Sequence, residues 1–481
     1  MSISSAIASA TSGLFATARA SQSVSDNVAN VLTPGYAPRE VVLESGRFGG
    51  VGVAAISRRE TQSLITDRRM AEADTSGEKA RSQSLSKVVD LVGSAENAGS
   101  LSGRVAALAA SLTSAASLPS SEQRLGTVVD SAQALTKHLN DAGDGVQTER
   151  LKADHAIGDA VEALNQGLQR IEQLNTEIAK AGGTGRDMNT LLDQRRSAID
   201  AVAGFIPVRE FPRDNGRVGL ITETGAVLML DSATEIGFSK AGGMTAGMTA
   251  GAPLSGLTIN GRSVDVTRDD GPIAGGKIAA LFELRDGELP AAQARLDGFA
   301  QELITRFQDK AADPSLQLGD AGLFVDDAVA PMASTVGLAQ RIAVNGAVDP
   351  DTSTGSLSRL RNGLSPMAAA RPEGDARVLQ SLADALQRPA VPQSAALGES
   401  SLGLGALADQ VVGAAAGAAF RAETDLGYSE GKLATLQEAE LSEGVNTDDE
   451  MRMLLLIEQA YAANAKVIQT AGMMLDRILE I

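Results

Sequence analysis

The two histidines are the side chains of this sequence best suited to acid–base catalysis or metal binding. His138 and His155 both fall in segments with helical periodicity, and their separation of 17 residues matches no recurrent spacing of zinc ligands. Cysteine is absent, which excludes disulfides, thiolate metal sites and cysteine nucleophiles. We therefore expect both histidines to be packing or solvated residues on helices.

Other polar motifs also lack the arrangement that a reaction or a cofactor needs. Residues 349–355 resemble a calcium loop, but the glycine comes one position late and no Glu stands at position twelve. The glycine pairs at 242–243 and 275–276 lack the Lys-Ser/Thr sequence of a phosphate loop. The acidic pairs at 269–270 and 448–449 fit a turn and a helix N-terminus. The sequence thus predicts no catalytic residues, no cofactor, no metal site and no enzyme activity.

The net charge of −18 limits the partners of the chain. A nucleic-acid-binding protein needs a basic surface, and no Lys/Arg-rich run is present. Anionic membrane surfaces are disfavoured for the same reason, and no run of about 18 apolar residues could span a membrane. Residues 1–18 carry no charge and therefore lack the basic region of a cleavable signal peptide. We expect neither nucleic acid nor membrane as a partner.

Both ends of the chain carry an apolar stripe with alternating steps of three and four residues, which is typical of a helix that packs along another helix. The N-terminal stripe includes Ile3, Ile7, Leu14, Val24 and Val28, and the C-terminal stripe includes Leu454, Ile457, Tyr461, Asn464, Ile468, Leu475 and Ile478. Asn464 is the polar exception, and it either sets the register or is tolerated at a wet seam. The two ends could pack against each other or against copies of themselves in neighbouring molecules.

Capping signals indicate where the two terminal helices meet the rest of the chain. The first helix should end within residues 32–36, because Pro34 disfavours a helical conformation of the residue before it and Gly35 allows a turn. The last helix should begin at Thr447, which can cap it, with Glu450 three residues later completing a capping box.

Between the ends, apolar residues with helical spacing predict long helices, with separate stripes over 125–139 and 157–178 and a break near 443–446. Aromatic residues make up only 3% and Trp is absent, which favours slim helices built from Ala, Leu, Val and Ile. The period changes to that of strands over about 205–285, where Asn260–Gly261 indicates a type I′ hairpin turn. The predicted fold is therefore mainly α with a β-rich insertion.

These patterns predict a long helical bundle to which the N- and C-terminal regions contribute together. Residues 1–60 with 440–481 would form a terminal coiled-coil domain, and residues 61–204 with 286–439 a helical bundle domain. Residues 205–285 would form a small central β domain.

Short segments at both ends resemble the terminal motifs of axial flagellar proteins. Residues 25–36, which read SDNVANVLTPGY, are similar to the N-terminal motif of rod and hook proteins, except that Leu32 replaces a polar residue. Residues 444–470 resemble the matching C-terminal motif. In the interior, residues 191–196 (LLDQRR) and 275–297 are similar to segments of the flagellar hook-associated protein 1 family, the junction proteins between hook and filament.

This resemblance implies a structural role in the bacterial flagellum, as an adaptor that joins hook to filament by helical self-assembly. The terminal helices would pair as the innermost layer of a tube, the middle helices would form a second layer, and residues 205–285 would face outward. The subunit and partner interface would comprise the two terminal stripes together with Asn30, Pro34, Gly35 and Tyr36. The implied partners are other copies of the chain, the hook protein, the second junction protein and a cytoplasmic export chaperone bound to residues 440–481.

The resemblance also implies export through the flagellar type III apparatus without a cleaved signal peptide, and hence a location in the extracellular flagellum. Three alternatives stay open. Another axial protein of hook, rod or second-junction type is disfavoured by the LLDQRR segment and the β-rich insertion. A wall hydrolase carried on the same export ends would need a carboxylate or histidine site in its middle. A free-standing coiled-coil adhesin would form stable oligomers without other flagellar proteins.

Overall fold

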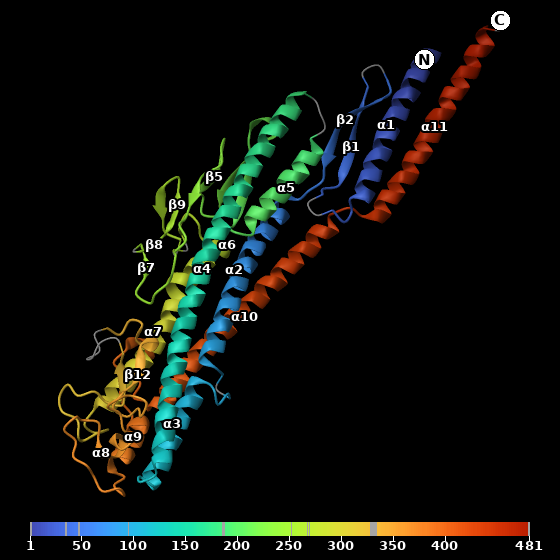
Figure 1. The fold of residues 1–481 in the computed structure, drawn as a ribbon. Coiled ribbons are helices and arrows are strands. Elements are labelled where there is room, and N and C mark those ends of the chain that lie inside the picture. Colours follow the sequence, from blue (N-terminus) through green and yellow to red (C-terminus); the bar gives the residue numbers. More distant parts are fainter. Residues whose placement is uncertain are drawn as a thin grey trace. The chain divides into compact units, whose positions relative to one another are not determined.

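The computed structural model describes residues 2–33, 36–46, 49–94, 96–184, 188–251, 253–266, 268, 270–327 and 334–479. Long helices dominate the chain (Figure 1). The helices are α1 (Ile3–Ala29), α2 (Gln62–Val92), α3 (Leu101–Ser117), α4 (Glu122–Thr184), α5 (Asn189–Ala203), α6 (Gly276–Glu283), α7 (Leu289–Gln308), α8 (Arg359–Asn362), α9 (Arg377–Gln387), α10 (Leu404–Ser442) and α11 (Thr447–Leu479). The predicted break between the last two helices is therefore confirmed.

The strands are short and form separate small sheets. They are β1 (Arg39–Ser45), β2 (Val51–Arg58), β3 (Val208–Pro212), β4 (Val218–Thr222), β5 (Val227–Met229), β6 (Ile236–Gly237), β7 (Thr249–Ala250), β8 (Pro253–Leu254), β9 (Leu257–Ile259), β10 (Arg262–Val264), β11 (Phe324–Asp326) and β12 (Ile342–Val344). The sheets have the orders β1-β2, β3-β4-β5, β10-β9-β6, β7-β8 and β11-β12, and among the strands in the described ranges only β7 and β8 pair in parallel.

The predicted fold class is confirmed, since strands β3 to β10 all fall within the β-rich insertion expected at 205–285. The hairpin turn between β9 and β10 also has the predicted geometry. Asn260 and Gly261 adopt φ values of 49° and 75°, the left-handed conformation that both central residues of a type I′ turn require.

The two stripes predicted at 125–139 and 157–178 belong to one continuous helix, α4. Between them the buried face passes through Ala142 and Val146 and then through Arg150 and Asp154, which are 2% and 0% exposed. The apolar pattern is interrupted there by two buried charged residues, so the sequence showed two stripes where the backbone forms one helix.

The chain divides into two compact units. Unit 1 comprises residues 1–73, 163–234 and 429–481, and unit 2 comprises residues 74–162 and 235–428. The boundary within the central insertion lies between Thr234 and Glu235, so its strands are distributed over both units. The three-part division expected from the sequence stays a proposal.

Unit 1 contains the pair of α1 and α11, the β1–β2 hairpin, and a layer formed by α5, the last part of α4 and the β3-β4-β5 sheet. Gly167 of α4 lets Val202 of α5 approach closely, because a Cβ at position 167 would lie 2.6 Å from the Val202 side chain. The buried Asn175 side chain joins α4 to β4, accepting from the Val218 amide and donating to its carbonyl.

Unit 2 has a core of aliphatic side chains with few aromatic rings. Phe307 of α7 and Phe324 of β11 pack edge to face with ring centroids 5.0 Å apart. A fully buried ion pair lies beside this core, where Arg285 donates to Asp154 at 2.8 Å and both side chains are 0% exposed. Unit 2 thus combines aliphatic helix packing with buried charged groups that are ion-paired, as Arg285 is, or hydrogen-bonded to carbonyl groups, as Arg150 is.

Candidate assembly interface

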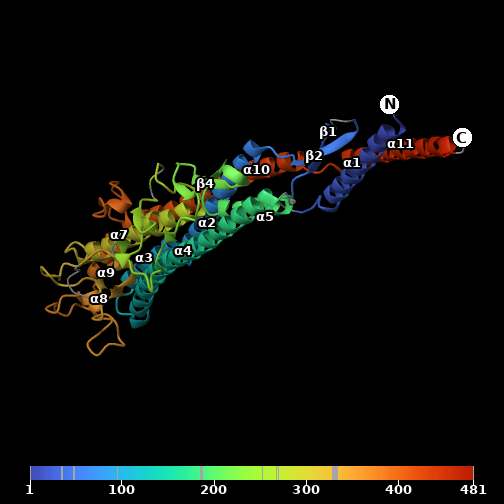
Figure 2. The same ribbon diagram turned by 90° about the horizontal axis from the view of Figure 1, so that it is seen from above.

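Helices α1 and α11 run antiparallel along each other within unit 1 (Figure 1, Figure 2). Asn27 in the last turn of α1 donates to Glu450 in the first turn of α11, with Nδ2 and Oε1 2.8 Å apart. Gly13, two heptads earlier in α1, faces Asn464, two heptads later in α11. The predicted pairing of the terminal helices is therefore present, while its coiled-coil supercoiling stays a prediction.

Small residues let the two helices approach closely. Ala10, Gly13 and Ala16 are buried on α1, and Ala471 is buried on α11. A Cβ at position 13 would lie 2.8 Å from Cγ of Asn464, so only glycine fits there without displacing that side chain. The Asn464 amide donates to the Ala460 carbonyl of its own helix at 3.0 Å. Asn464 is thus matched to Gly13 by shape.

Asn27 is the polar centre of the interface and is only 1% exposed. Its amide nitrogen donates to Glu450 of α11 and to the Arg39 carbonyl of β1, at 2.8 and 3.0 Å. Its carbonyl oxygen accepts from the Tyr36 hydroxyl and from the Arg39 amide, at 2.8 and 2.9 Å. One side chain therefore joins α1, the segment that follows it, strand β1 and α11.

Tyr36 lies in a partly buried, charged environment beside this centre. Burial raises the pKa of the Tyr36 phenol to about 12, and the Arg39 guanidinium, 5.0 Å from the ring centroid, opposes that shift. The phenol stays protonated at physiological pH and remains a hydrogen-bond donor to Asn27. Its hydroxyl links the residues just before β1 to α1.

The β1–β2 hairpin lies against α1. The Ser12 hydroxyl of α1 accepts from the Val51 amide at 3.1 Å, and the Ser23 hydroxyl donates to the Arg39 carbonyl at 2.9 Å. Gly50 has a φ of 82°, and a Cβ there would collide with Ser12. Two hydroxyl groups on α1 thus hold the two strands of the hairpin, and a glycine permits the contact.

The LLDQRR segment of α5 ties this hairpin to the rest of unit 1. Asp193 accepts from Arg39 of β1 at 3.1 Å and from Arg58 of β2 at 2.8 Å. Arg195 donates to the Asn175 side chain of α4 at 3.1 Å. A segment that the sequence singled out only by resemblance therefore carries the charges that position the hairpin.

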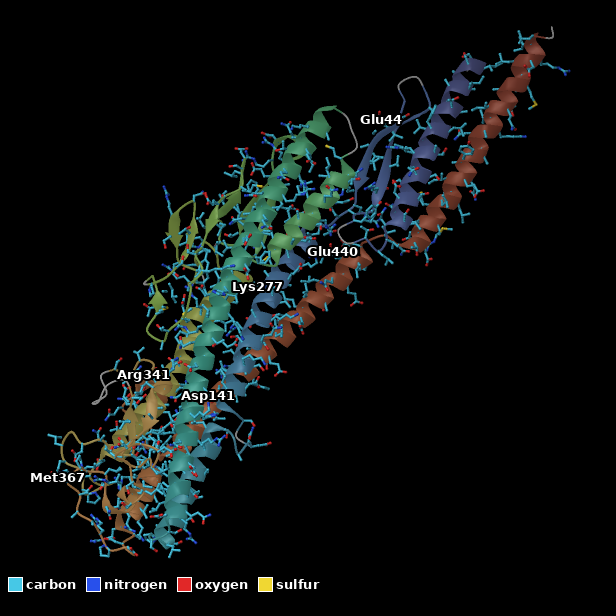
Figure 3. All side chains as sticks on the ribbon, in the orientation of Figure 1. Glu44, Asp141, Lys277, Arg341, Met367 and Glu440 are labelled. Atoms are coloured by element: carbon cyan, nitrogen blue, oxygen red, sulfur yellow. The ribbon has the colours of Figure 1, made fainter. Side chains whose placement is uncertain are left out.

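Glu440 connects the end of α10 to the same network (Figure 3). Its carboxylate pairs with Arg196 of α5 and with Arg68 of α2, the latter at 2.6 Å. Arg68 also pairs with Asp200 at 2.7 Å. Both arginine side chains are only 10% exposed. The residues just before the break between α10 and α11 are thus held by buried guanidinium groups.

The start of α11 corrects one prediction. The cap is Asn446, not Thr447, because the Asn446 side-chain oxygen accepts from the amides of Asp448 and Asp449 at 3.0 and 3.3 Å. The predicted capping box is therefore wrong, since Glu450 uses its carboxylate to accept from Asn27.

The predicted interface residues occupy different environments in unit 1. Val24 and Ile457 are buried, Ile3, Ile7, Leu14, Asn30, Tyr36, Leu454, Asn464 and Ile468 are half-buried, and Val28, Tyr461, Leu475 and Ile478 are exposed. Pro34 and Gly35 lie outside the described residues. The assignment of all these residues to an interface with another subunit or a partner protein stays a prediction. Gly13 and Asn27 were not among the predicted interface residues, and no local sequence signal marks either of them, since α1 contains many other small and polar residues.

Much apolar surface of α11 is left uncovered by α1. Its exposed large side chains are Met451, Met453, Leu455, Leu456, Tyr461, Val467, Met473, Met474, Leu475, Ile478 and Leu479. A groove of about 550 Å³ runs between α1, the hairpin and α11, with Val24, Val41 and Leu456 among its lining residues. This surface is suited to further helix packing.

The described residues contain no group of three or more His, Asp or Glu side chains that could hold a metal ion. Within the same ranges, no helix combines the length and the apolar character that crossing a membrane requires.

Two family models match this chain. Residues 85–319 match the helical domain of flagellar hook-associated protein FlgK, and residues 437–481 match the C-terminal region of the flagellar basal body rod FlgEFG proteins. The resemblance that the terminal and interior motifs predicted is therefore confirmed.

Individual relatives carry the same description. Flagellar hook-associated protein 1 of Salmonella typhimurium (strain LT2) is 27% identical over 241 residues, which cover 48% of this chain and 43% of the relative. The protein of the same description from Escherichia coli (strain K12) is 22% identical over 338 residues, covering 66% of this chain and 59% of the relative. The chain thus spans less than two thirds of the length of these relatives. The solved flagellar hook junction protein FlgK from Burkholderia pseudomallei is 20% identical, with a TM-score of 0.43, over 54% of this chain and 46% of that one.

Proposed function

Since its helical middle and its C-terminal end match the FlgK and rod FlgEFG families, we propose that this chain is a structural component of the bacterial flagellum that joins the hook to the filament. The observation that carries the proposal is the pair of α1 and α11, which leaves most large apolar side chains of α11 exposed. Such a surface is stabilised when neighbouring helices cover it. The role is structural and requires no catalysis.

Assembly uses the terminal helices as the contact surface between copies. Each copy presents the α1–α11 pair, and neighbouring copies cover the exposed residues such as Tyr461, Leu475 and Ile478. Contacts of this kind are heterologous, and they generate a ring or a helical tube according to the rotation between copies. In the tube the terminal pair forms the inner layer and residues 205–285 face outward.

The other partners follow from the position of the junction. The hook protein lies on one side of the ring and the second junction protein on the other. Before export, a cytoplasmic chaperone binds α11 by covering its apolar side chains in a groove, a common mode of helix recognition. The chain then passes through the flagellar type III apparatus without a cleaved signal peptide and reaches the extracellular flagellum.

The LLDQRR network supports a second part of the proposal. Asp193, Arg196 and Glu440 connect the hairpin, α5 and the end of α10 through partly buried ion pairs within unit 1. Such pairs fix the side chains that form them, because guanidinium and carboxylate groups in low dielectric surroundings are costly to separate. We infer that during assembly this network holds the end of the α1–α11 pair where both helices connect to the rest of unit 1.

The experiment that tests this function removes the chain from a flagellated cell. We expect hooks to be built without attached filaments, and filament subunits to accumulate in the medium. Supplying the chain again should restore attached filaments, and antibodies against it should label the junction in electron micrographs. Filaments that remain attached without the chain would refute the proposal, and labelling along the whole hook or rod would support a different axial role.

A further inference from the structure

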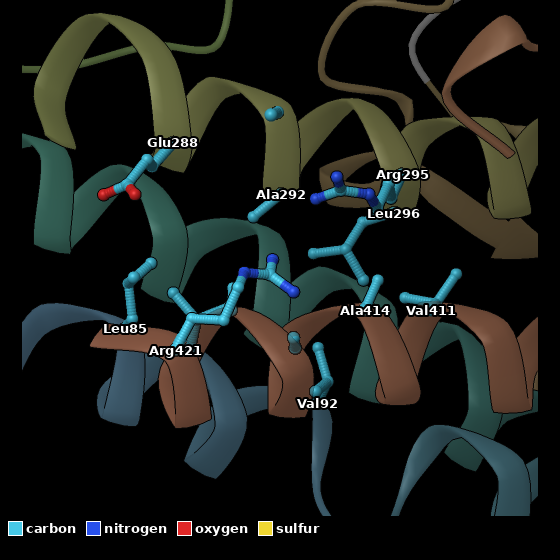
Figure 4. Close-up of a pocket in the computed structure, with 13 residues that line it drawn as sticks. Leu85, Val92, Glu288, Ala292, Arg295, Leu296, Val411, Ala414 and Arg421 are labelled. Carbon is cyan, nitrogen blue, oxygen red and sulfur yellow. The ribbon is translucent and has the colours of Figure 1, made fainter. Parts of the chain in front are cut away.

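A small apolar cavity of about 160 Å³ lies between α2, α7 and α10 in unit 2 (Figure 4). Leu85 and Val92 of α2, Leu296 of α7 and Val411 of α10 form its walls. Alanines such as Ala292 and Ala414 leave the space free, because larger side chains at these positions would fill it. An apolar cavity of about 150 Å³ accommodates benzene, so this one has room for the side chain of a leucine.

Two arginines border the cavity and give it a positive charge. Arg295 of α7 and Arg421 of α10 both line it, and Figure 4 shows their guanidinium groups in the space between these two helices. Neither group has a hydrogen-bond or ion-pair partner among the residues that the structure describes. The nearby carboxylate of Glu288 is already neutralised by Arg81, at 2.6 Å. Two guanidinium groups beside an apolar cavity suit an apolar side chain that has a carboxylate next to it.

Unit 2 also presents such a group. Leu318 is fully exposed, at 103% of its reference area, whereas Leu316 two residues earlier is 1% exposed in the core. Hydrogen bonds and a glycine define the turn that carries Leu318. Gly319 has a φ of 93°, the Asp320 amide donates to the Gln317 carbonyl at 3.1 Å, and the Asp320 side chain accepts from the Gln317 amide at 2.9 Å. Leu318 is therefore an apolar side chain on a hydrogen-bonded turn, with the Asp320 carboxylate next to it.

Leu318 cannot reach the cavity of its own copy. Gln308 at the end of α7 donates to the Asp320 carbonyl at 2.9 Å, which places the turn at that end of the helix. The cavity residue of α7 nearest to that end is Leu296, twelve residues earlier, which corresponds to about 18 Å along the axis. This separation exceeds the reach of any side chain, so the two features can meet only between copies.

We propose that Leu318 of one copy inserts into the cavity of a neighbouring copy, where Asp320 pairs with Arg295 and Arg421. The contact is heterologous, because turn and cavity are different surfaces, and every copy offers both. It rests on the proposed assembly of the chain but uses neither α1 nor α11. It therefore adds a second contact between copies, formed by unit 2, to the contact made by the terminal helices.

Cysteine cross-linking in assembled flagella tests this contact, because the chain contains no cysteine of its own. Cells producing the double variant Leu318→Cys/Ala292→Cys as their only copy should yield isolated junctions that give a ladder of covalent dimers and larger oligomers after mild oxidation. The matched control, Leu118→Cys/Ala292→Cys, pairs the cavity with another exposed leucine of unit 2 and should give monomers. Assembled junctions without a ladder would overturn the contact and leave the proposed function standing. Absence of the unmodified chain from junctions would overturn both.

Surface substitutions provide a second measurement that does not depend on cross-linking. Leu318→Asp should leave the fold intact, since the side chain is fully exposed, and should lower the number of copies per junction at least threefold. Arg421→Asp should lower it as well, because it places a second carboxylate against Asp320, whereas Arg421→Lys keeps the positive charge and should retain most of it. Normal incorporation of Leu318→Asp would refute the proposal.

Discussion

Asn27 and Glu450 are 423 residues apart in the chain, yet the Asn27 amide donates a hydrogen bond of 2.8 Å to the Glu450 carboxylate. The bond joins the last turn of α1 to the first turn of α11. It therefore fixes the register of the antiparallel pair at the end where both helices connect to the rest of unit 1.

The substitution Asn27→Ala should loosen this end of the pair. It leaves the Tyr36 hydroxyl and the Arg39 amide without their acceptor in a buried site, which costs about 2 kcal/mol. Hydrogen exchange of the amides in 36–45 and 447–455 should become roughly 30-fold faster, since 1.4 kcal/mol corresponds to a factor of ten. The control Gln22→Ala removes an exposed amide on the same helix and should change little. Unchanged exchange in the Asn27 variant would contradict the assignment.

Gly13 and Asn464 allow a test of close packing in the middle of the pair. Gly13→Ala should destabilise the pair by about 1 kcal/mol, because the new methyl group displaces the Asn464 side chain from its bond to the Ala460 carbonyl. Gly472→Ala on α11 meets nothing within 4 Å and should stabilise its helix by up to about 1 kcal/mol. Hydrogen exchange of both helices measures the difference.

A double variant separates steric conflict from a general effect on α1. Asn464→Ala removes the side chain that the methyl group would meet, so Gly13→Ala/Asn464→Ala should be more stable than Gly13→Ala alone. Additive effects of the two substitutions would argue against a contact between them.

Glu440 should be required for the order of the last turns of α10. Glu440→Gln leaves Arg68 and Arg196 with fewer negative partners, although Asp200 and Glu60 remain in contact with them. We expect a loss of about 2 kcal/mol in protection of residues 429–442, because both guanidinium groups are largely buried. Glu438→Gln, an exposed carboxylate two residues away, is the control and should have no measurable effect. Equal exchange rates in the two variants would show that the network is dispensable.

The sequence was sufficient to predict elements whose signals are local. The Asn260–Gly261 turn, the break before α11 and the β-rich insertion depend on backbone preferences of a few neighbouring residues, and the structure contains all three. Helix α4 is an element that local signals could not predict in full. Its buried face includes Arg150 and Asp154, and their partners, the Arg285 backbone and side chain, lie about 130 residues further along the chain.

The face of α1 that packs on α11 shows why the sequence could not predict which residues are buried in this interface. The size of their apolar side chains favoured Leu14 and Val28 as interface residues, but the neighbouring Gly13 and Asn27 are the buried ones. Position 13 requires a glycine because α11 lies so close to it. Asn27 is buried because its hydrogen-bond partners lie in β1 and α11. Both reasons depend on segments distant in sequence, which periodicity cannot reveal.

Acidification should destabilise unit 2 through His138. Burial lowers the pKa of His138 from its ordinary value of 6.5, opposed by its hydrogen bond to the Val92 carbonyl at 3.3 Å. The unfolded chain then binds a proton at a higher pH than the folded one, so stability falls as the pH drops below about 6.5, by at most about 1.4 kcal/mol per pH unit.

The variant His138→Gln keeps a donor for the Val92 carbonyl but cannot titrate. We expect the difference in thermal unfolding between pH 7.5 and pH 5 to become smaller in this variant. His155→Gln, at an exposed position on the same helix, should leave the difference as it is. An identical pH dependence in wild type and His138→Gln would exclude this residue as the cause.

Deleting residues 465–481 should separate assembly from folding. The described part of this segment contributes one buried residue, Ala471, to the pair with α1, whereas Val467, Met473, Leu475 and Ile478 are exposed. The truncated chain should therefore keep normal protease resistance over 62–442 but lose incorporation into junctions and binding to the export chaperone. Lys466→Ala, a change at an exposed position in the same segment, controls for general effects. If the truncated chain is still incorporated, the exposed face of α11 beyond Asn464 cannot be the surface that assembles.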